Sequence, residues 1–345
     1  MIGRGNILEV AKVPAIMSAR KLCIITDKCV APLWLEKVTG QLKDKKVCVI
    51  IIPTGEHNKT LDTLQYIWKQ MIEGDVDRST VAIALGGGVV CDIGGFAAGT
   101  FMRGIPVVHI PTTLLAQVDA SIGGKTAIDF CDLKNCIGIF HPPSAVLINV
   151  RTLSTLPEKQ VLSGMAEIIK HAIIADRMLL KELKNKNVRS ILDKEWVRIV
   201  SRSVEIKKVI VKQDEQERNG IRKQLNFGHT VGHAIESLRL NTEHPLLHGE
   251  AVALGMISEA HMSVLLGILS QQEEDEIIKT IQGIGLPTKC THFSVVDIKR
   301  VMKNDKKNTN GQMLFSLPLK IGKVTSDCIV PDQIIEESLQ IIMDK

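Results

Sequence analysis

Apolar residues follow two different periods in the two halves of the chain. Between positions 22 and 150, short apolar runs rich in β-branched residues alternate with stretches of mixed polarity. The runs are almost continuously apolar, which is typical of parallel strands covered on both faces. The first half is therefore predicted to be a parallel α/β domain with strands at 22–26, 47–52, 81–85, 107–110 and 145–149.

Beyond position 156 the strand pattern nearly disappears. Apolar residues there recur every three or four positions, which indicates helices. The expected helices cover 161–180, 196–211, 231–240, 251–269 and 275–284. Near the end, 312–317 and 324–329 are expected to form a small hairpin before a last helix that begins at Pro331.

The change of pattern predicts two domains. At 345 residues the chain exceeds the size at which one hydrophobic core keeps growing. We expect an N-terminal nucleotide-binding α/β domain over 1–152 and a C-terminal helical domain over 153–345. The stretch 251–270 has the length of a membrane span, but Glu259 and His261 at its centre favour a buried helix.

Composition narrows the class of partner. The net charge of +5 comes from 43 basic and 38 acidic residues that are interspersed, and aromatic residues make up only 3% of the chain, which argues against a nucleic-acid groove. Eight cysteines without CxxC spacing indicate free thiols, and positions 1–20 lack the apolar core of a signal peptide. We expect a cytoplasmic protein that acts on a small molecule, with no nucleic-acid or membrane partner.

A glycine-rich loop, GGGVVCD at 86–92, follows the third expected strand. A strand that turns through glycines into a helix directs backbone N–H groups at one point and can hold a pyrophosphate. Cys91 stands where the common dinucleotide fingerprint has its third glycine, and a simple tight turn is the alternative. Asp27, Glu56 and Lys59 follow the first two strands, where an open α/β sheet meets its nucleotide, although solvated loop charges would look the same.

Histidines and a carboxylate in the second half suggest a metal site. His229 and His233 stand at i and i+4 on one helix face, His248 precedes the next long helix, and Glu167 and Lys170 lie in an apolar stretch. Burying such groups without partners costs several kcal/mol, which a divalent metal would remove. Two histidines and one glutamate form a zinc set with an open position. The alternative is a set of ordinary core histidines and a surface glutamate.

Six sequence blocks occur in the order in which 3-dehydroquinate synthases have them. They read GGGVVCD, FMRGIPVVHIPTTLLAQVDASIGGKTAID, LKNCIG, SGMAEIIKHA, LNFGHTVGHAIE and HGEAVALGM. Over nearly its whole length the chain resembles that family. The resemblance implies NAD and one divalent metal, zinc or cobalt, between a nucleotide-binding and a helical domain, and a homodimer.

The resemblance also implies roles for individual residues. The implied metal ligands are Glu167, His229 and His248. His233 would then handle protons, with Asp119 and Lys170 as further catalytic groups. The implied NAD-binding residues are Asp27, Glu56, Lys59, Gly87, Gly88, Val89, Asp92, Thr112, Thr113, Asp119, Lys125 and Lys134.

The family's substrate carries a carboxylate at one end and a phosphate at the other. Arg222 and Lys208 are assigned to the carboxylate, because a guanidinium binds a carboxylate bidentately. The other residues assigned to the substrate, mainly to its phosphate, are Lys125, Lys134, Asn135, Asn226, Lys306, Lys307 and Arg103, the last from the neighbouring subunit. One departure is that residues 130–133 replace the small, proline-rich stretch that the family has before its lysine-asparagine pair.

The implied reaction converts 3-deoxy-D-arabino-heptulosonate 7-phosphate to 3-dehydroquinate and phosphate in the shikimate pathway. It proceeds by transient oxidation by NAD, phosphate elimination, re-reduction and intramolecular aldol closure. The alternatives are another sugar phosphate cyclase, which makes an inosose or a valiolone, a metal-dependent glycerol or alcohol dehydrogenase, and an inactive NAD-binding scaffold. Arg222 and Lys208 discriminate against the cyclases, whose substrates lack the carboxylate.

Overall fold

The computed structural model describes residues 1–131, 133–184, 186–239, 245–290, 293–303 and 312–344. The chain forms two compact units. Unit 1 consists of Met1–Leu156 and Leu192–Val204, and unit 2 of Pro157–Ile191 and Glu205–Lys345. Helix α7 (Asp193–Gln213) contributes residues to both.

Unit 1 is built on a five-stranded parallel sheet with the order β3-β2-β4-β5-β8. Its strands are β2 (Lys21–Asp27), β3 (Lys46–Ile52), β4 (Val81–Gly86), β5 (Val107–Pro111) and β8 (Ala145–Val146). The predicted parallel sheet is therefore confirmed. The fifth predicted strand is interrupted, because Ile148–Asn149 forms β9 and pairs with β1 (Ile2–Gly3) instead.

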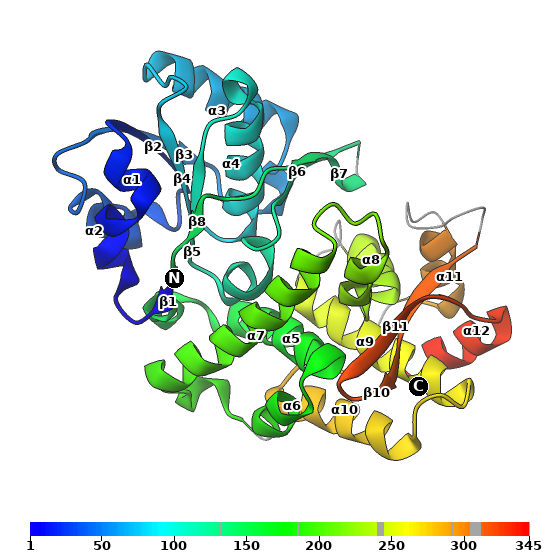
Figure 1. Cartoon of the computed structure of the whole chain (residues 1–345). Coiled ribbons are helices and arrows are strands. Elements are labelled where there is room, and N and C mark those ends of the chain that lie inside the picture. Colours follow the sequence, from blue (N-terminus) through cyan, green and yellow to red (C-terminus); the bar gives the residue numbers. More distant parts are fainter. Residues whose placement is uncertain (132, 185, 240–244, 291–292, 304–311, 345) are drawn as a thin grey trace. The chain divides into compact units, whose positions relative to one another are not determined.

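Helices cover both faces of this sheet (Figure 1). On one face α3 (Leu61–Glu73) and α4 (Gly88–Thr100) pack on a core that includes Ile25. On the other face, Ile24 belongs to a second core. The elements there are η1 (Asn6–Lys12), α1 (Pro14–Ser18), η2 (Ala31–Leu35) and α2 (Glu36–Thr39). Consecutive residues of β2 thus enter different cores, which explains the continuously apolar run.

The antiparallel pair β6 (Lys125–Phe130) and β7 (Leu133–Phe140) is not predicted from the sequence. Strand β7 mixes charged, polar and apolar residues and lies largely exposed, so it lacks the apolar run that marks the other strands. Gly138 permits the pairing, since a Cβ there would collide with Thr126 O. The pair carries Lys125, Lys134 and Asn135.

Unit 2 is mainly helical, as predicted, with one hairpin. Its helices, besides its share of α7, are α5 (Glu158–Ala175), α6 (Arg177–Leu183), α8 (His229–Arg239), α9 (His248–Leu265), α10 (Gln271–Ile284), α11 (Val295–Lys303) and α12 (Asp332–Gln340). Strands β10 (Leu314–Lys320) and β11 (Lys323–Ile329) form the expected antiparallel hairpin, and Pro331 is the N-cap of the last helix.

The single helix predicted at 161–180 is wrong. The chain forms α5 and α6 there, because the Asp176 side chain accepts a hydrogen bond from Leu179 N and caps a new helix. Helix α9 is buried along most of its length, and Glu259 on it is 0% exposed. Within the described ranges no helix combines the length and the apolarity that crossing a membrane requires.

Candidate functional site

The glycine loop of unit 1 joins β4 to α4 at the carboxyl edge of the sheet. Gly87 is the N-cap of α4, so the positive end of the helix dipole lies at this edge. The turn is tight, because a Cβ on Gly86 would lie 2.6 Å from Val90 Cβ and one on Gly87 3.0 Å from Thr113 Cγ2. Such a loop lets an anion approach the backbone closely.

Two neighbouring loops are organised at the same edge. The Asp27 carboxylate accepts hydrogen bonds from Cys29 N at 2.8 Å, Val30 N at 3.0 Å and Thr54 Oγ1 at 3.0 Å. Asp27 therefore holds the loop that follows β2 and ties it to the loop that follows β3.

The loop after β5 lies beside the glycines. Thr112 N donates to Gly86 O at 2.9 Å, and Thr113 Oγ1 accepts from Ala116 N at 3.2 Å. Asp119 lies in the helical turn that follows, η5 (Ala116–Ala120). The expected NAD-binding residues of these loops thus lie together at one end of the parallel strands.

Lys59 is the centre of a buried charge cluster in unit 1. The lysine is 2% exposed, and its Nζ lies 2.8 Å from Glu56 Oε1, 3.4 Å from Asp92 Oδ2 and 3.5 Å from Asp129 Oδ1. It also donates to Asn135 Oδ1 at 2.8 Å. Burial lowers the pKa of Lys59, but the three carboxylates outweigh burial and raise it. Burial raises the pKa of Asp92 to about 6 against the charge of Lys59.

We expect Lys59→Met to lower the free energy of unfolding by about 3–5 kcal/mol, because it leaves several carboxylates close together without their cation. Urea denaturation measures this change. The matched control is Lys12→Met, whose exposed pair with Glu9 is expected to contribute less than about 1 kcal/mol. If the two substitutions lowered the free energy of unfolding equally, the buried Lys59 cluster would not stabilise the fold more than an exposed ion pair does.

The candidate metal centre lies in unit 2, where three helices bring their side chains together. Glu167 comes from the middle of α5, His229 from the first turn of α8 and His248 from the first turn of α9. Glu167 Oε1 lies 3.5 Å from His229 Nε2 and 3.3 Å from His248 Nε2. These ligand atoms all lie within 4.8 Å of one another. The set can hold one divalent cation.

Hydrogen bonds orient both imidazoles. His248 Nδ1 lies 3.1 Å from Glu236 Oε2, and His229 Nδ1 lies 3.1 Å from Phe227 O. In each ring the second nitrogen, Nε2, is the one that faces Glu167. Such outer partners fix the tautomer of a metal-binding histidine. Burial lowers the pKa of His248, but hydrogen bonds to Glu167 and Glu236 raise it to about 10.

His233 lies next to these rings. Its ring centroid is 5.0 Å from that of His229 and 6.0 Å from that of His248. His233, Glu236 and His248 form a second group whose geometry could hold a metal. In that group, however, Glu236 already binds His248 Nδ1, whereas Glu167 faces the Nε2 atoms of two histidines. The geometry therefore favours the Glu167 set.

Two of the cationic residues predicted to act on or bind the substrate are buried in unit 2, namely Lys170 and Arg222. Lys170 is 1% exposed and forms an ion pair with Glu167 one turn away on α5. Arg222 is 4% exposed, its Nη1 donates to Glu215 O at 3.0 Å, and its main-chain N donates to Asp214 at 3.3 Å. A structured loop thus holds the guanidinium in place.

The other described residues that are predicted to bind the substrate are more exposed than Lys170 and Arg222. Lys208 on α7 is exposed and pairs with Glu205 at 3.2 Å, and Lys134 on β7 lies 3.8 Å from Glu56. Lys125 and Arg103 are exposed, and Asn226 is half-buried at the end of η8 (Ile221–Asn226). Two predicted residues lie outside the described part of the chain, namely Lys306 and Lys307.

Two glutamates for which the sequence predicts no role lie close to the histidines. Glu236 binds His248, and Glu259 binds main-chain N–H groups at the start of α8. The spacing could have indicated Glu236, because it stands seven residues after His229 and so on the same face of α8. No local spacing links Glu259 to this helix.

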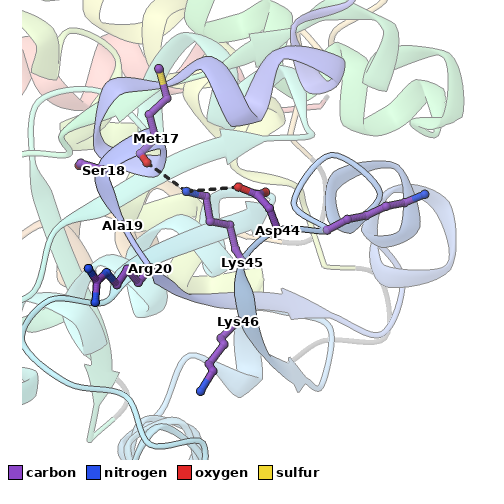
Figure 2. Close-up of a pocket in the computed structure, with 8 residues that line it drawn as sticks. Met17, Ser18, Ala19, Arg20, Asp44, Lys45 and Lys46 are labelled. Carbon is purple, nitrogen blue, oxygen red and sulfur yellow. Dashed lines mark hydrogen bonds and ion pairs between the residues drawn. The ribbon is translucent and has the colours of Figure 1, made fainter.

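A hollow of about 460 Å³ lies at the amino ends of β2 and β3 (Figure 2). Its basic side chains come from Arg20 and the charged run 43–46. Lys45 Nζ donates to Met17 O at 3.0 Å and lies 3.6 Å from Asp44. Open α/β sheets bind ligands at the opposite, carboxyl edge, so we do not assign the nucleotide to this hollow.

Family models match most of the chain. Residues 49–163 match the model described as 3-dehydroquinate synthase N-terminal, and residues 164–308 match 3-dehydroquinate synthase C-terminal. A 3-dehydroquinate synthase of Desulforamulus reducens is 45% identical over 311 residues, which cover 88% of this chain and 86% of that protein. One of Acetivibrio thermocellus is 43% identical over 319 residues, 91% of this chain and 87% of that protein.

Solved structures share the fold. A 2-epi-5-epi-valiolone synthase of Streptomyces hygroscopicus with NAD+ and Zn2+ bound aligns with a TM-score of 0.89 at 26% identity, over 99% of this chain and 95% of that one. A 2-deoxy-scyllo-inosose synthase complexed with carbaglucose-6-phosphate, NAD+ and Co2+ aligns with a TM-score of 0.88 at 25% identity, over 98% and 95%. A glycerol dehydrogenase of Schizosaccharomyces pombe has a TM-score of 0.67 at 16% identity, over 99% and 89%, and so shares the fold alone.

Proposed function

The chain belongs to the 3-dehydroquinate synthase family, and on this premise we propose which of its residues perform the reaction. The enzyme is a lyase that converts 3-deoxy-D-arabino-heptulosonate 7-phosphate to 3-dehydroquinate and phosphate in the shikimate pathway. The observation that carries the assignment of residues is the approach of two imidazole Nε2 atoms to one oxygen of Glu167.

The residues of unit 2 fit a divalent metal. Glu167 supplies an anionic oxygen at 0% exposure, and His229 and His248 each turn Nε2 toward it. The donor set of two imidazoles and one carboxylate suits zinc or cobalt and leaves coordination positions for substrate oxygens. We assign Glu167, His229 and His248 as ligands, with Glu236 holding His248.

The residues of unit 1 fit NAD. The glycine turn at Gly86–Gly88 and the start of α4 offer backbone N–H groups to the pyrophosphate. Asp27 and the loop of Thr112 and Thr113 lie at the same carboxyl edge, where open α/β sheets bind nucleotides. Lys59 serves mainly to hold Glu56, Asp92 and Asn135 in place, because its buried ammonium group already binds all three.

When bound, the metal acidifies substrate hydroxyls and NAD accepts and returns a hydride, so that NAD is regenerated in each turnover. Around these groups the chain moves protons. His233 lies beside the ligand rings, and we assign it the proton transfers at the substrate hydroxyls. Lys170, buried beside Glu167, holds the carboxylate in place and offers its ammonium group to substrate oxygens. Asp119 is assigned to the proton transfers by family position.

We assign the two anionic ends of the substrate to two separate sets of residues. Arg222 binds the carboxylate, and Lys208 adds a second charge. Lys125, Asn135, Asn226 and one of Lys306 and Lys307 are assigned to the phosphate, and Lys134 is assigned to the substrate as a further cation. We further propose that the enzyme is a cytoplasmic homodimer and that Arg103 of one protomer reaches the phosphate bound by the other.

Another sugar phosphate cyclase is the second candidate, because the most similar of the solved structures described above make a valiolone and an inosose. Their identities of 26% and 25% are well below the 45% to a 3-dehydroquinate synthase. Phosphate release from the heptulosonate substrate is expected to require NAD and to give no net NADH. Stoichiometric NADH would indicate a dehydrogenase, and release only from phosphorylated sugars without a carboxylate would indicate a different cyclase.

Arg222→Lys is expected to raise KM for the heptulosonate about 30-fold, roughly 2 kcal/mol, because an ammonium group cannot bind a carboxylate bidentately. Metal content should stay unchanged. Steady-state kinetics measure the effect. The matched control is Arg189→Lys, an exposed arginine that pairs with Glu158 in the same unit and should leave KM within twofold of its original value. An unchanged KM in Arg222→Lys would contradict the carboxylate assignment.

A further inference from the structure

Glu259 is a fully buried carboxylate that the reaction does not use. It lies in α9 at 0% exposure and receives hydrogen bonds from the segment that opens α8. Oε2 accepts from Gly228 N at 2.6 Å, and Oε1 accepts from Thr230 N at 3.1 Å and from Val231 N at 3.2 Å. A side chain of one helix thus caps the amino end of another.

The bonded segment contains a proposed metal ligand. His229 is flanked by Gly228 and Thr230, whose N–H groups both point to the Glu259 carboxylate. The first N–H groups of a helix have no partner within it, and a negative charge at this end is favourable. The carboxylate therefore fixes the main chain on both sides of His229.

Glycines bring the two helices close enough for this contact. A Cβ on Gly255 of α9 would collide with Gly228 O and lie 2.8 Å from Gly232 N, and one on Gly232 would lie 3.1 Å from Ala251 O. The backbones of α8 and α9 therefore touch where His229 begins its helix. Because α9 also carries His248 in its first turn, one helix supplies a ligand and the group that holds the other ligand's backbone.

We propose that Glu259 is a positioning residue of the metal centre, which through three main-chain hydrogen bonds to the start of α8 places His229 opposite Glu167 and His248. The inference rests on the proposed metal ligands. It differs from them in that Glu259 touches neither the metal nor the substrate. It requires that the geometry of the centre, and so its affinity for metal, depends on a carboxylate that faces the backbone.

The test is Glu259→Gln in the full-length enzyme. The amide nitrogen of glutamine would meet a backbone N–H donor, so at least one of the three bonds is lost and the start of α8 shifts. We expect a 10- to 100-fold lower affinity for Zn2+ in competition with a chromophoric chelator, and an altered visible spectrum with Co2+. Both measurements are independent of turnover. Far-UV circular dichroism and NAD binding should be unchanged.

Glu274→Gln is the matched control. Glu274 is 2% exposed in the same unit, and its carboxylate binds His261 Nδ1 at 2.7 Å and Gln271 at 2.6 Å, neither of which belongs to α8. Its Zn2+ affinity should stay within twofold of that of the unaltered enzyme. Equal losses in both variants, or no loss in Glu259→Gln, would overturn the proposal.

A second variant covers the case in which Glu259→Gln does not fold. Glu259→Asp keeps the charge but is too short to reach all three N–H groups, so we expect a smaller loss of Zn2+ affinity, of at least threefold. Unchanged affinity in Glu259→Asp would then overturn the proposal. If Glu167→Gln retained full Zn2+ affinity, the assignment of the metal ligands would be wrong. Loss of Zn2+ affinity in Glu167→Gln without any loss in the Glu259 variants would contradict the positioning role alone.

Discussion

Glu167→Gln is expected to lower the affinity for Zn2+ by more than about 100-fold and to abolish phosphate release, because the only anionic ligand of the proposed set is lost. Glu167 Oε1 lies 3.3 and 3.5 Å from the two imidazole Nε2 atoms, so no other described carboxylate oxygen is placed between both. The measurements are metal content after dialysis and the rate of phosphate release from the heptulosonate.

The control separates metal loss from loss of folding. Glu167→Gln also leaves the buried Lys170 without its carboxylate partner, which is destabilising in itself. The double variant Glu167→Gln/Lys170→Met removes both charges, and we expect it to recover thermal stability but not metal. Glu236→Gln should give a graded loss of about 10- to 100-fold in affinity, since it binds His248 and not the metal. Full metal content in Glu167→Gln would mean that the ligands are assigned wrongly.

His233→Ala is expected to retain the metal while kcat falls by about 10²- to 10⁴-fold, the usual contribution of a positioned acid or base. The ring of His233 lies 5.0 and 6.0 Å from the rings of His229 and His248, which is why we propose that it acts on substrate held at the metal. Metal content, NAD binding and kcat measured on one preparation test the whole statement.

The same variant decides between the two candidate metal-ligand groups that share His248. If His233, Glu236 and His248 were the ligands, His233→Ala would lose the metal and His229→Ala would keep it. We expect the reverse. Retention of metal in His229→Ala together with its loss in His233→Ala would refute the proposed mechanism, because His233 would then have no lone pair left for protons.

Local pattern determined much of the fold. The apolar runs located the parallel strands because residues such as Ile24 and Ile25 are buried on opposite faces, so both must be apolar. The apolar pattern did not predict elements that depend on features other than a buried apolar face. Strand β7 is largely exposed and therefore has no apolar run, and α5 ends at Ala175 because the side chain of Asp176 caps the next helix.

For the candidate site, the sequence by itself determined which chemical groups are available: the glycine turn, the histidines of α8 and α9, and a glutamate in an apolar stretch. Spacing alone placed His229 and His233 on one helix face but left open which of them binds metal. Only the tertiary structure turned the Nε2 atoms of His229 and His248 toward Glu167, which stands 62 positions before His229 in the chain. Spacing could have indicated Glu236 as a residue on the His229 face of α8, but its hydrogen bond to His248 and those of Glu259 to the start of α8 depend on helix packing, because hydrogen bonds between helices leave no periodic trace in a sequence.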